Sequence, residues 1–369
     1  MEKMNPQIDN IFHDNNILQF TLQNVNVSIA NTLRRTILSD IETFVFRTAP
    51  YDKCDANIEV NTTRLNNEIL KQRLSCIPIH IKDDDFPYNN FILVVDEENT
   101  SNVIQYVTTE HFKLYDTVTK TYMPESDLRK IFPKNPITNY YIDFARLRPR
   151  ISDEIPGESL KLTCKLSKAT AKDDYMYNVA CNSSYGFTQD RVKVDDMWNK
   201  KEKELKESKS LTQDDIEYIK NDWYNLDAKR IFVSNSYNFT VETVGVYTPY
   251  ELVKKACKVI YEEFKNFNSQ NYTINTSDVT MNNSFDVILF NKDHTFGKCL
   301  EYLLYIKYFE GDKTLSYCGF QKKHPHDDYS IIRLAYNGDI EQDTINKNIQ
   351  SACDDGVQLF KDIEQLFID

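Results

Sequence analysis

The feature that most constrains this chain is a strand–helix unit that occurs twice, near its two ends. In the first copy, residues 17–25 alternate apolar and polar side chains as a strand does, and Ser28 can cap a helix over about 29–41. The apolar stripe of that helix includes Ile29, Leu33 and Ile37. A stripe at this spacing predicts an amphipathic helix with one buried face.

The same unit returns later in the chain. Residues 285–290 indicate a strand, and Thr295 can cap a helix over about 296–309. The apolar stripe of this helix includes Phe296, Leu300 and Leu304. The six residues that begin at Ser28 and the six that begin at Thr295 follow the same pattern of residue types. In order, each segment has a helix cap, an apolar residue, a small residue, a polar residue, a polar residue or Cys, and Leu. We therefore interpret the two helices as copies of one design.

Each unit has a second half of the same kind. A strand over 237–245 precedes a helix over about 249–267, and a strand over 330–336 precedes a helix over about 343–367. The apolar faces of these two helices include Ala256 and Ile260, and Ala352 and Leu359. Both helices carry an Ala-Cys pair at matching points, Ala256-Cys257 and Ala352-Cys353.

Two copies of strand–helix–strand–helix predict the α+β class and a particular pairing. A small sheet with helices on one side buries its apolar face only when another layer covers it. We expect the two copies to cover each other as a pseudo-twofold dimer within one chain. An obligate interface of this kind buries on the order of 2,000 Å² or more, and the covalent tether raises its effective concentration to about millimolar.

The two copies differ in what separates their halves, and this sets the predicted domains. We predict a first dimerisation module over 1–45 plus 231–268 and a second over 272–369. Between the halves of the first, a β-rich inserted subdomain is predicted over 46–186, and a charged helical insertion over 187–230. The β-like runs of the insert are 58–60, 77–81, 91–95, 103–107 and 160–166. The charged insertion is interpreted as a solvated helix, with partner docking as the alternative.

Composition excludes several functions. The chain has 44 Lys and Arg against 56 Asp and Glu, which gives a net charge of −12. This acidic balance disfavours nucleic-acid binding. With 8 glycines, the chain spells no GxGxxG, P-loop or GxSxG, and it also lacks HExxH. We therefore predict no catalytic residues and no cofactor.

The cysteines and the chain start indicate a reduced, intracellular protein. The 8 Cys are dispersed with no CxxC, residues 1–20 lack a signal-peptide pattern, and no apolar run reaches membrane length. Asp83–Asp85 and His324–Asp328 are interpreted as polar turns rather than metal ligands. We predict no metal site.

Three segments carry a family resemblance. The stretch over 31–41 reads N-T-L-R-R-T-I-L-S-D-I and resembles the N-A-L-R-R-x-L-L-S helix of RNA polymerase alpha subunits and of their archaeal D and eukaryotic third-subunit counterparts. The stretch over 70–79 resembles the R-L-x-x-I-P-L segment of the same family. Residues 292–297, K-D-H-T-F-G, with His324-Pro325 resemble the D-H-T-L-G…H-P signature of archaeal subunit L and the eukaryotic eleventh subunit.

The resemblance implies a fused alpha-like subunit of DNA-directed RNA polymerase, as in nucleocytoplasmic large (giant, mimivirus-like) DNA viruses. It implies a non-catalytic assembly platform whose partners are the two largest polymerase subunits and small zinc-binding subunits. By resemblance, Arg35 and, less strongly, Arg34 lie on the surface that docks a large subunit. Many relatives carry a metal or iron–sulfur site built on closely spaced Cys, and Cys54, Cys76, Cys164 and Cys181 lack that spacing.

The resemblance also implies where in the cell the protein acts, and two alternative functions are left open. A viral polymerase subunit is expected in the host cytoplasm, in viral factories, and in the virion. The alternative is a nucleic-acid-binding transcription regulator, which needs a basic stripe with interleaved aromatic residues. A stand-alone hydrolase or transferase is the other alternative, and it needs a convergent set of ionisable residues for which no motif is present.

Overall fold

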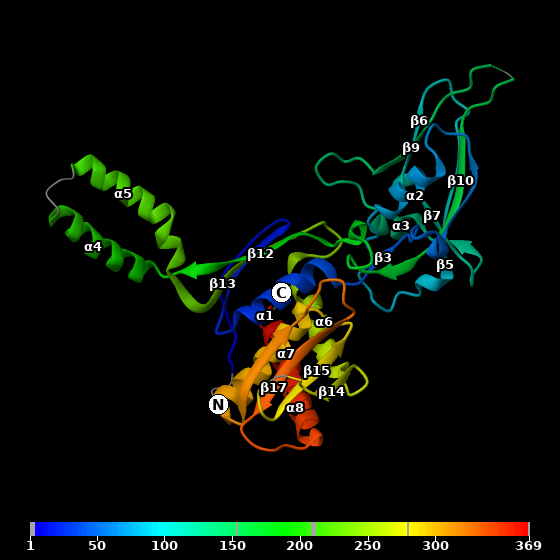
Figure 1. Ribbon diagram of the computed structural model, residues 1–369. Coiled ribbons are helices and arrows are strands. Elements are labelled where there is room, and N and C mark those ends of the chain that lie inside the picture. Colours follow the sequence, from blue (N-terminus) through cyan, green and yellow to red (C-terminus); the bar gives the residue numbers. More distant parts are fainter. Residues whose placement is uncertain (1–3, 153, 208–211, 279, 368–369) are drawn as a thin grey trace. The chain divides into compact units, whose positions relative to one another are not determined.

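The computed structural model describes residues 4–152, 154–207, 212–278 and 280–367. Residues 1–3, 153, 208–211, 279 and 368–369 belong to the predicted domain ranges but lie outside the described residues. The chain divides into two compact units, shown in Figure 1. Unit 1 comprises Met1–Ile37, Asn182–Glu242 and Pro249–Asp369, and unit 2 comprises Leu38–Cys181 and Thr243–Thr248. Helices and strands are mixed along the chain, so the fold class is α+β, as predicted.

The first copy of the repeat forms a four-stranded sheet with two helices. Its strands lie in the order β1-β2-β13-β12. They are β1 (Gln7–Asp14), β2 (Ile17–Gln23), β12 (Ala180–Gln189) and β13 (Phe232–Thr243), and the helices are α1 (Val27–Ser39) and α6 (Pro249–Asn266). In the centre, β2 pairs antiparallel with β13, and Phe20 stacks on Phe239 with 5.0 Å between ring centroids. Sequence analysis identified β2 and β13 and missed β1 and β12.

The second copy repeats this arrangement. Its strands lie in the order β14-β15-β17-β16. They are β14 (Tyr272–Thr276), β15 (Ser284–Phe290), β16 (Leu315–Gln321) and β17 (Tyr329–Tyr336), and the helices are α7 (His294–Leu304), continued by the π-helical η6 (Tyr305–Gly311), and α8 (Gln342–Gln365). Both copies follow the chain order strand, strand, helix, strand, strand, helix, and in both sheets the third and fourth strands exchange places.

The first helix of each copy begins two residues before the predicted position. Helix α1 begins at Val27, and the Asn26 side chain accepts a hydrogen bond from the Ser28 backbone N–H at 2.9 Å. Helix α7 begins at His294, and the Asp293 side chain accepts from the Thr295 backbone N–H at 2.8 Å. The predicted caps Ser28 and Thr295 are therefore wrong, because Asn and Asp two residues earlier satisfy the free N–H groups of the first turn.

The charged insertion is a helical hairpin rather than one solvated helix. It consists of α4 (Arg191–Glu207), α5 (Gln213–Asn225) and the 3-10 turn η5 (Asp227–Arg230). Its small core is made of Val194, Trp198, Ile216, Trp223 and Ala228. The two indoles lie 6.4 Å apart and tether the helices to each other. The prediction recognised the charged face of α4 and missed this apolar seam.

Unit 2 is built on a five-stranded sheet in the order β4-β10-β5-β7-β8, with two additional strand pairs, β3 with β11 and β6 with β9. Its strands are β3 (Thr43–Val45), β4 (Ala56–Asn61), β5 (Phe91–Glu98), β6 (Gln105–Thr108), β7 (Lys113–Asp116), β8 (Thr121–Tyr122), β9 (Asp143–Leu147), β10 (Ser159–Lys165) and β11 (Ser167–Ala169). Its helical elements are α2 (Asn67–Ser75), α3 (Glu125–Ile131), η1 (Tyr51–Lys53), η2 (Tyr88–Asn90), η3 (Thr109–His111) and η4 (Tyr175–Tyr177).

One predicted strand of unit 2 is absent. The runs over 58–60, 91–95 and 160–166 fall largely in β4, β5 and β10, and the run over 103–107 overlaps β6. Residues 77–81 form no strand, although the side chains of Ile77, Ile79 and Ile81 are buried in the core. Pro78 has no N–H to give to a sheet, so this segment packs apolar side chains without joining a ladder.

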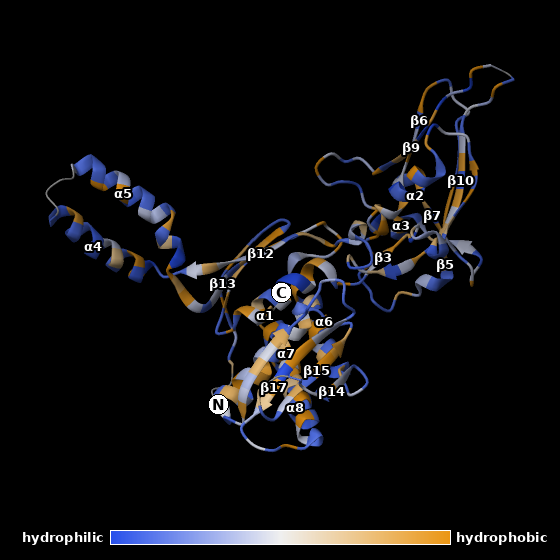
Figure 2. Cartoon of the chain, in the orientation of Figure 1, coloured by the Kyte–Doolittle hydropathy of each residue, from blue (hydrophilic) through white to orange (hydrophobic). Residues whose placement is uncertain are grey.

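Hydropathy follows this architecture. Figure 2 shows α4 and α5 as largely hydrophilic, whereas the strands around β15 are hydrophobic. Within the described ranges, no helix combines the length and the apolar character needed to cross a bilayer.

Candidate assembly interface

The apolar stripes of α1 and α7 are buried in unit 1. The side chains of Ile29, Leu33 and Ile37 on α1 are fully inaccessible, and those of Phe296, Leu300 and Leu304 on α7 are nearly so. Each side chain of this size contributes roughly 1.5–3 kcal/mol when it leaves water. These helices therefore supply much of the apolar area that stabilises the unit.

The late helices α6 and α8 pack against each other, so the two copies of the repeat are in contact. The predicted residues Ala256, Ile260, Ala352 and Leu359 are all buried. Phe264 of α6 stacks on Phe360 of α8 with 6.3 Å between centroids, and its ring lies 4.7 Å from that of Phe296 on α7. An aromatic cluster thus joins α6 of the first copy to both helices of the second.

A close approach of helices explains a glycine in α8. A Cβ atom on Gly356 would lie 3.1 Å from side-chain atoms of Leu303 and of Phe264. Glycine removes that crowding and lets α8 approach α6 and α7 closely. A large side chain at this point would overpack the contact.

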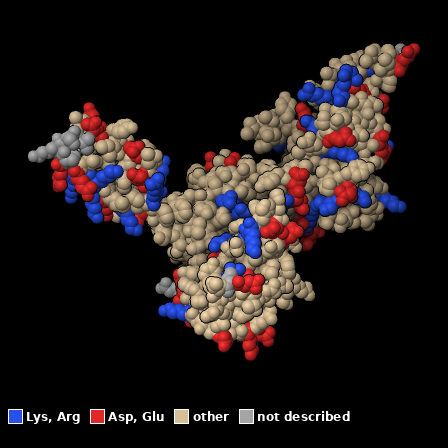
Figure 3. Space-filling model, viewed as in Figure 1, with Lys and Arg blue, Asp and Glu red and all other residues tan. Residues whose placement is uncertain are grey.

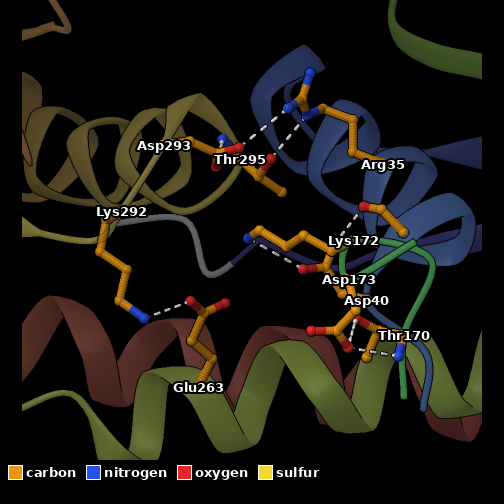
Figure 4. A network of polar contacts seen from close by, with 10 residues as sticks. Arg35, Asp40, Thr170, Lys172, Asp173, Glu263, Lys292, Asp293 and Thr295 are labelled. Carbon is orange, nitrogen blue, oxygen red and sulfur yellow. Dashed lines mark hydrogen bonds and ion pairs between the residues drawn. The ribbon is translucent and has the colours of Figure 1, made fainter. Parts of the chain in front are cut away.

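Polar contacts between α1 and the start of α7 accompany the apolar ones (Figure 4). The Arg35 guanidinium donates from Nε to Thr295 Oγ1 at 2.7 Å and from Nη2 to Asp293 Oδ2 at 3.1 Å. The Thr32 hydroxyl donates to the Thr295 carbonyl oxygen at 2.7 Å. Because Asp293 also caps α7, Arg35 contacts the helix start through the capping side chain itself.

The Arg35–Asp293 ion pair is partly solvated, with side chains 41% and 33% exposed. Pairs of this exposure contribute about 0–1 kcal/mol. Arg34 lies differently: its Nε and Nη2 donate to Asn31 Oδ1 on the same helix at 3.1 and 3.0 Å. The two candidate docking residues therefore have different environments, since Arg35 bonds to residues of the second copy and Arg34 bonds within its own helix.

A second ion pair joins the copies. Lys292, just before α7, donates to Glu263 Oε1 on α6 at 2.6 Å, and its ammonium group lies 5.0 Å from the Phe296 ring centroid. Figure 4 also shows a separate polar group within unit 2, where Lys172 pairs with Asp40 at 3.5 Å and Asp173 accepts from Thr170. Sequence analysis missed these pairs, since opposite charges so far apart in sequence give no local signal.

Three thiols lie in this interface and are held neutral. Burial raises the pKa of the Cys257 and Cys299 thiols well above the ordinary range, and it raises the pKa of Cys353 to about 12. The Thr32 hydroxyl of α1 lies close enough to the Cys299 thiol to offset part of this rise in its pKa. Buried neutral thiols act as small apolar side chains and make poor nucleophiles.

The His, Cys, Asp and Glu side chains of the described residues are dispersed. In the part of the chain that the structure describes, no three His, Cys, Asp or Glu side chains lie close enough together to hold a metal ion. Cys54, Cys76, Cys164 and Cys181 form no disulfide and differ in exposure.

The segment that resembles R-L-x-x-I-P-L lies in unit 2, where it includes α2 and the buried run after it. Arg73 donates from Nε to the Phe144 carbonyl at 2.7 Å and from Nη2 to the Asp143 carbonyl at 2.6 Å. Here Arg73 has a structural function, because it ties α2 to β9.

Comparison with known proteins agrees with this geometry. The family described as the RNA polymerase Rpb3/Rpb11 dimerisation domain matches residues 19–264. The chain is 24% identical over 312 aligned positions to DNA-directed RNA polymerases I and III subunit RPAC1 of Homo sapiens, covering 71% of this chain and 84% of the relative.

Other relatives give the same picture. The RPAC1 protein of Bos taurus is 23% identical with the same coverage. DNA-directed RNA polymerases IV and V subunit 3B of Arabidopsis thaliana is 39% identical over 61 residues, which are 16% of this chain and 17% of that one. Because the family match spans more than half of the 369 residues and includes α1 and most of α6, the chain belongs to the RNA polymerase Rpb3/Rpb11 dimerisation domain family.

Proposed function

We propose that this chain is a non-catalytic assembly platform of a multisubunit DNA-directed RNA polymerase, in which two alpha-like modules pair within one chain. The observation that carries the proposal is that matching residues of the two copies contact each other. Thr32 and Cys299 occupy the same place in the two aligned segments, and the Thr32 hydroxyl lies close enough to the Cys299 thiol to lower its pKa.

A second contact of this kind supports the pairing. Counting from the matching pairs Ala256-Cys257 and Ala352-Cys353, Phe264 is the counterpart of Phe360, and these rings stack. In a twofold arrangement a residue contacts its own counterpart only near the axis. Two such contacts, one between the early helices and one between the late helices, support a pseudo-twofold axis between the copies.

The domain limits of the proposal follow from the repeat. The first alpha-like module is proposed over 1–45 plus 231–268 and the second over 272–369, with a β-rich insertion over 46–186 and the helical insertion over 187–230. The identical chain order of strands and helices in the two sheets supports two modules of one kind, and the first sheet also includes β12, which lies outside the proposed limits of the first module.

The proposed partners are the two largest polymerase subunits and small zinc-binding subunits. The printed names of the relatives support a polymerase setting, since RPAC1 is a subunit of polymerases I and III. A rigid pair of modules presents one surface to each large chain, and Arg35 is the proposed docking contact because its side chain is partly exposed. Phosphodiester chemistry then belongs to the large subunits.

We further propose an origin in a nucleocytoplasmic large DNA virus, with the chain acting in the host cytoplasm and packaged in the virion. The presence of both modules in one chain and the abundance of Asn support this origin. Mass spectrometry of purified virions tests it, and absence of the chain from them would contradict packaging.

The direct test of the platform is capture of the two largest subunits by the tagged chain after co-expression. The wild-type chain should retain both subunits, and Arg35→Ala should weaken capture of one of them by about tenfold. Asp293→Ala is the matched control, because it breaks the Arg35–Asp293 ion pair but leaves the arginine in place.

Each result of this test has a clear meaning. Unchanged capture by Arg35→Ala would contradict the docking role, as would an equal loss in Asp293→Ala, which would assign the effect to the cap of α7. Capture of neither subunit by the wild-type chain would contradict the platform itself. DNA binding with a steep salt dependence would instead favour a nucleic-acid-binding regulator.

A further inference from the structure

Unit 2 contains a cavity rich in arginine that the platform role does not use. The cavity has a volume of about 390 Å³, and it is lined by α2, β9 and the segments just before α2 and β6. Its charged lining consists of Arg64, Arg73, Arg146, Arg148 and Asp143. Four guanidinium groups and one carboxylate around one cavity stand out in a chain of net charge −12.

One of the four arginines is neutralised. Arg148 donates to Glu158 Oε1 at 2.5 Å, and the Glu158 side chain is nearly buried. In the part of the chain that the structure describes, Arg64, Arg73 and Arg146 have no ion pair with a carboxylate. Three guanidinium charges therefore face the cavity and its surroundings with Asp143 as the acidic residue of the lining.

Two of these arginines are held in place by contacts that leave their charge uncompensated. Arg73 donates to two backbone carbonyls of β9 from Nε and Nη2, and these bonds do not use its Nη1. The guanidinium carbon of Arg146 lies 5.1 Å from the ring centroid of Tyr106, its partner across the β6–β9 strand pair. Arginines fixed in this way lose less side-chain entropy when they bind an anion.

We propose that this cavity binds a phosphate monoester. Three uncompensated arginines and one aspartate leave a local charge of about +2, and a phosphate monoester carries about −1.5 to −2 at pH 7. A carboxylate carries a single charge and would leave the site positive. Guanidinium groups also match phosphate oxygens bidentately, which adds geometric selectivity to the charge match.

The remaining lining suits the organic part of the ester. Leu65, Ile104, Phe144 and Ala145 supply apolar walls, and the cavity falls at the lower end of the size range of small-molecule sites. Figure 3 shows Lys and Arg gathered over the part of unit 2 that carries β6 and β9, with red atoms beyond. The basic groups form a compact patch rather than a long stripe, which favours a single phosphate ester over a nucleic-acid strand.

The test is a calorimetric titration of the whole 369-residue chain with phenyl phosphate. Benzoate is the matched probe, since it keeps the ring and carries one charge. Phenyl phosphate should bind saturably and at least about tenfold more tightly than benzoate. The double variant Arg64→Gln/Arg146→Gln should weaken phenyl phosphate about tenfold or more, because each lost charged hydrogen bond reduces affinity.

Arg230→Gln is the control variant, because Arg230 lies in the helical hairpin and its side chain is 84% exposed. It should leave the titration unchanged. The single variants Arg64→Gln and Arg146→Gln replace the double variant if that one does not fold, and each should weaken binding. A phosphoserine peptide run in parallel identifies the source: tighter binding than phenyl phosphate indicates a phosphorylated protein segment, and equal or weaker binding indicates a small phosphate ester.

Three results would overturn the proposal. They are the absence of saturable binding of phenyl phosphate, equal affinity for benzoate, and an affinity that the cavity variants do not change.

Discussion

The two copies of the repeat share one topology and differ in their connections. Both place two strands, a helix, two strands and a helix in the same chain order and sheet order. In the first copy, unit 2 and the helical hairpin lie between α1 and β13, whereas in the second a short segment joins α7 to β16. The helices that contact the other copy are the elements that both retain.

This difference teaches where the fold tolerates change. The segment between α1 and β12 starts after the last residue of the buried α1 stripe, Ile37, so a large insertion there leaves the helix contacts intact. Loop-closure entropy rises only slowly with length, so a long insertion costs little. Interface side chains are more constrained, because α6 of the first copy packs on α8 of the second.

The largest expected effect comes from a charge in the shared core. Leu300→Asp, and equally Leu33→Asp in the other copy, should reduce the free energy of unfolding by about 4 kcal/mol or more, because both side chains are fully buried. Urea unfolding followed by circular dichroism measures the loss. Tyr218→Asp on the exposed face of α5 is the control. Equal stability of Leu300→Asp and wild type would contradict a buried core shared by the two copies.

A next smaller effect tests whether the copies are coupled through matching residues. Phe264→Ala and Phe360→Ala should each lower the free energy of unfolding by about 3–5 kcal/mol. Because the two rings stack, the double variant should lose about 0.5–1.5 kcal/mol less than the sum of the single losses. Strict additivity in this cycle would mean that the two helices do not share a contact at these residues.

The buried thiols of the interface predict how the stability of the protein depends on pH. A thiol whose pKa is raised by folding keeps its proton at a pH where the unfolded chain has lost it. Its contribution to the free energy of unfolding is therefore fully present below pH about 8.5 and is lost as pH rises above that value. With the pKa of Cys353 at about 12, the loss between those values is up to about 1.4 kcal/mol per pH unit.

Replacing this thiol tests the effect. In Cys353→Ala, the free energy of unfolding should decrease less steeply between pH about 8.5 and about 10 than in the wild type. Urea unfolding at each pH measures this slope. The exposed Cys76→Ala is the matched control and should leave the slope unchanged. An identical slope in Cys353→Ala and wild type would contradict a buried neutral thiol in α8.

The smallest effect is expected at the solvated contact between copies. A double-mutant cycle on Arg35 and Asp293 should give a coupling of about 0–1 kcal/mol, decreasing with added salt. A coupling above about 2 kcal/mol would mean that the pair is far less solvated than its exposure indicates.

Much of this fold could be predicted from local pattern. The spacing of Ile29, Leu33 and Ile37 predicted a buried helix face, and the repetition of that pattern predicted a second helix like it. The edge strands β1 and β14 were missed because edge strands carry many exposed polar residues and show no clear alternation. The helix starts were misplaced because two cap-forming residues stand in the same short stretch at each start.

The polar contacts and the cavity could not be predicted. Arg35 and Asp293 are separated by 258 positions, and no single-sequence signal joins residues so distant. The arginines of the cavity are similarly scattered over α2, β9 and the segments beside them. In the sequence, each of these arginines resembles an ordinary surface residue. Only the fold brings the arginines together around one cavity.

The most direct test of intrachain pairing is a disulfide between matching residues of the two copies. Thr32→Cys places a second thiol beside Cys299, and refolding under mild oxidation should join residues 32 and 299 within one chain, as detected by peptide mass spectrometry. The same variant with Cys299→Ala should form no such bond. Two free thiols at these positions, or a bond that joins two separate chains, would contradict the account.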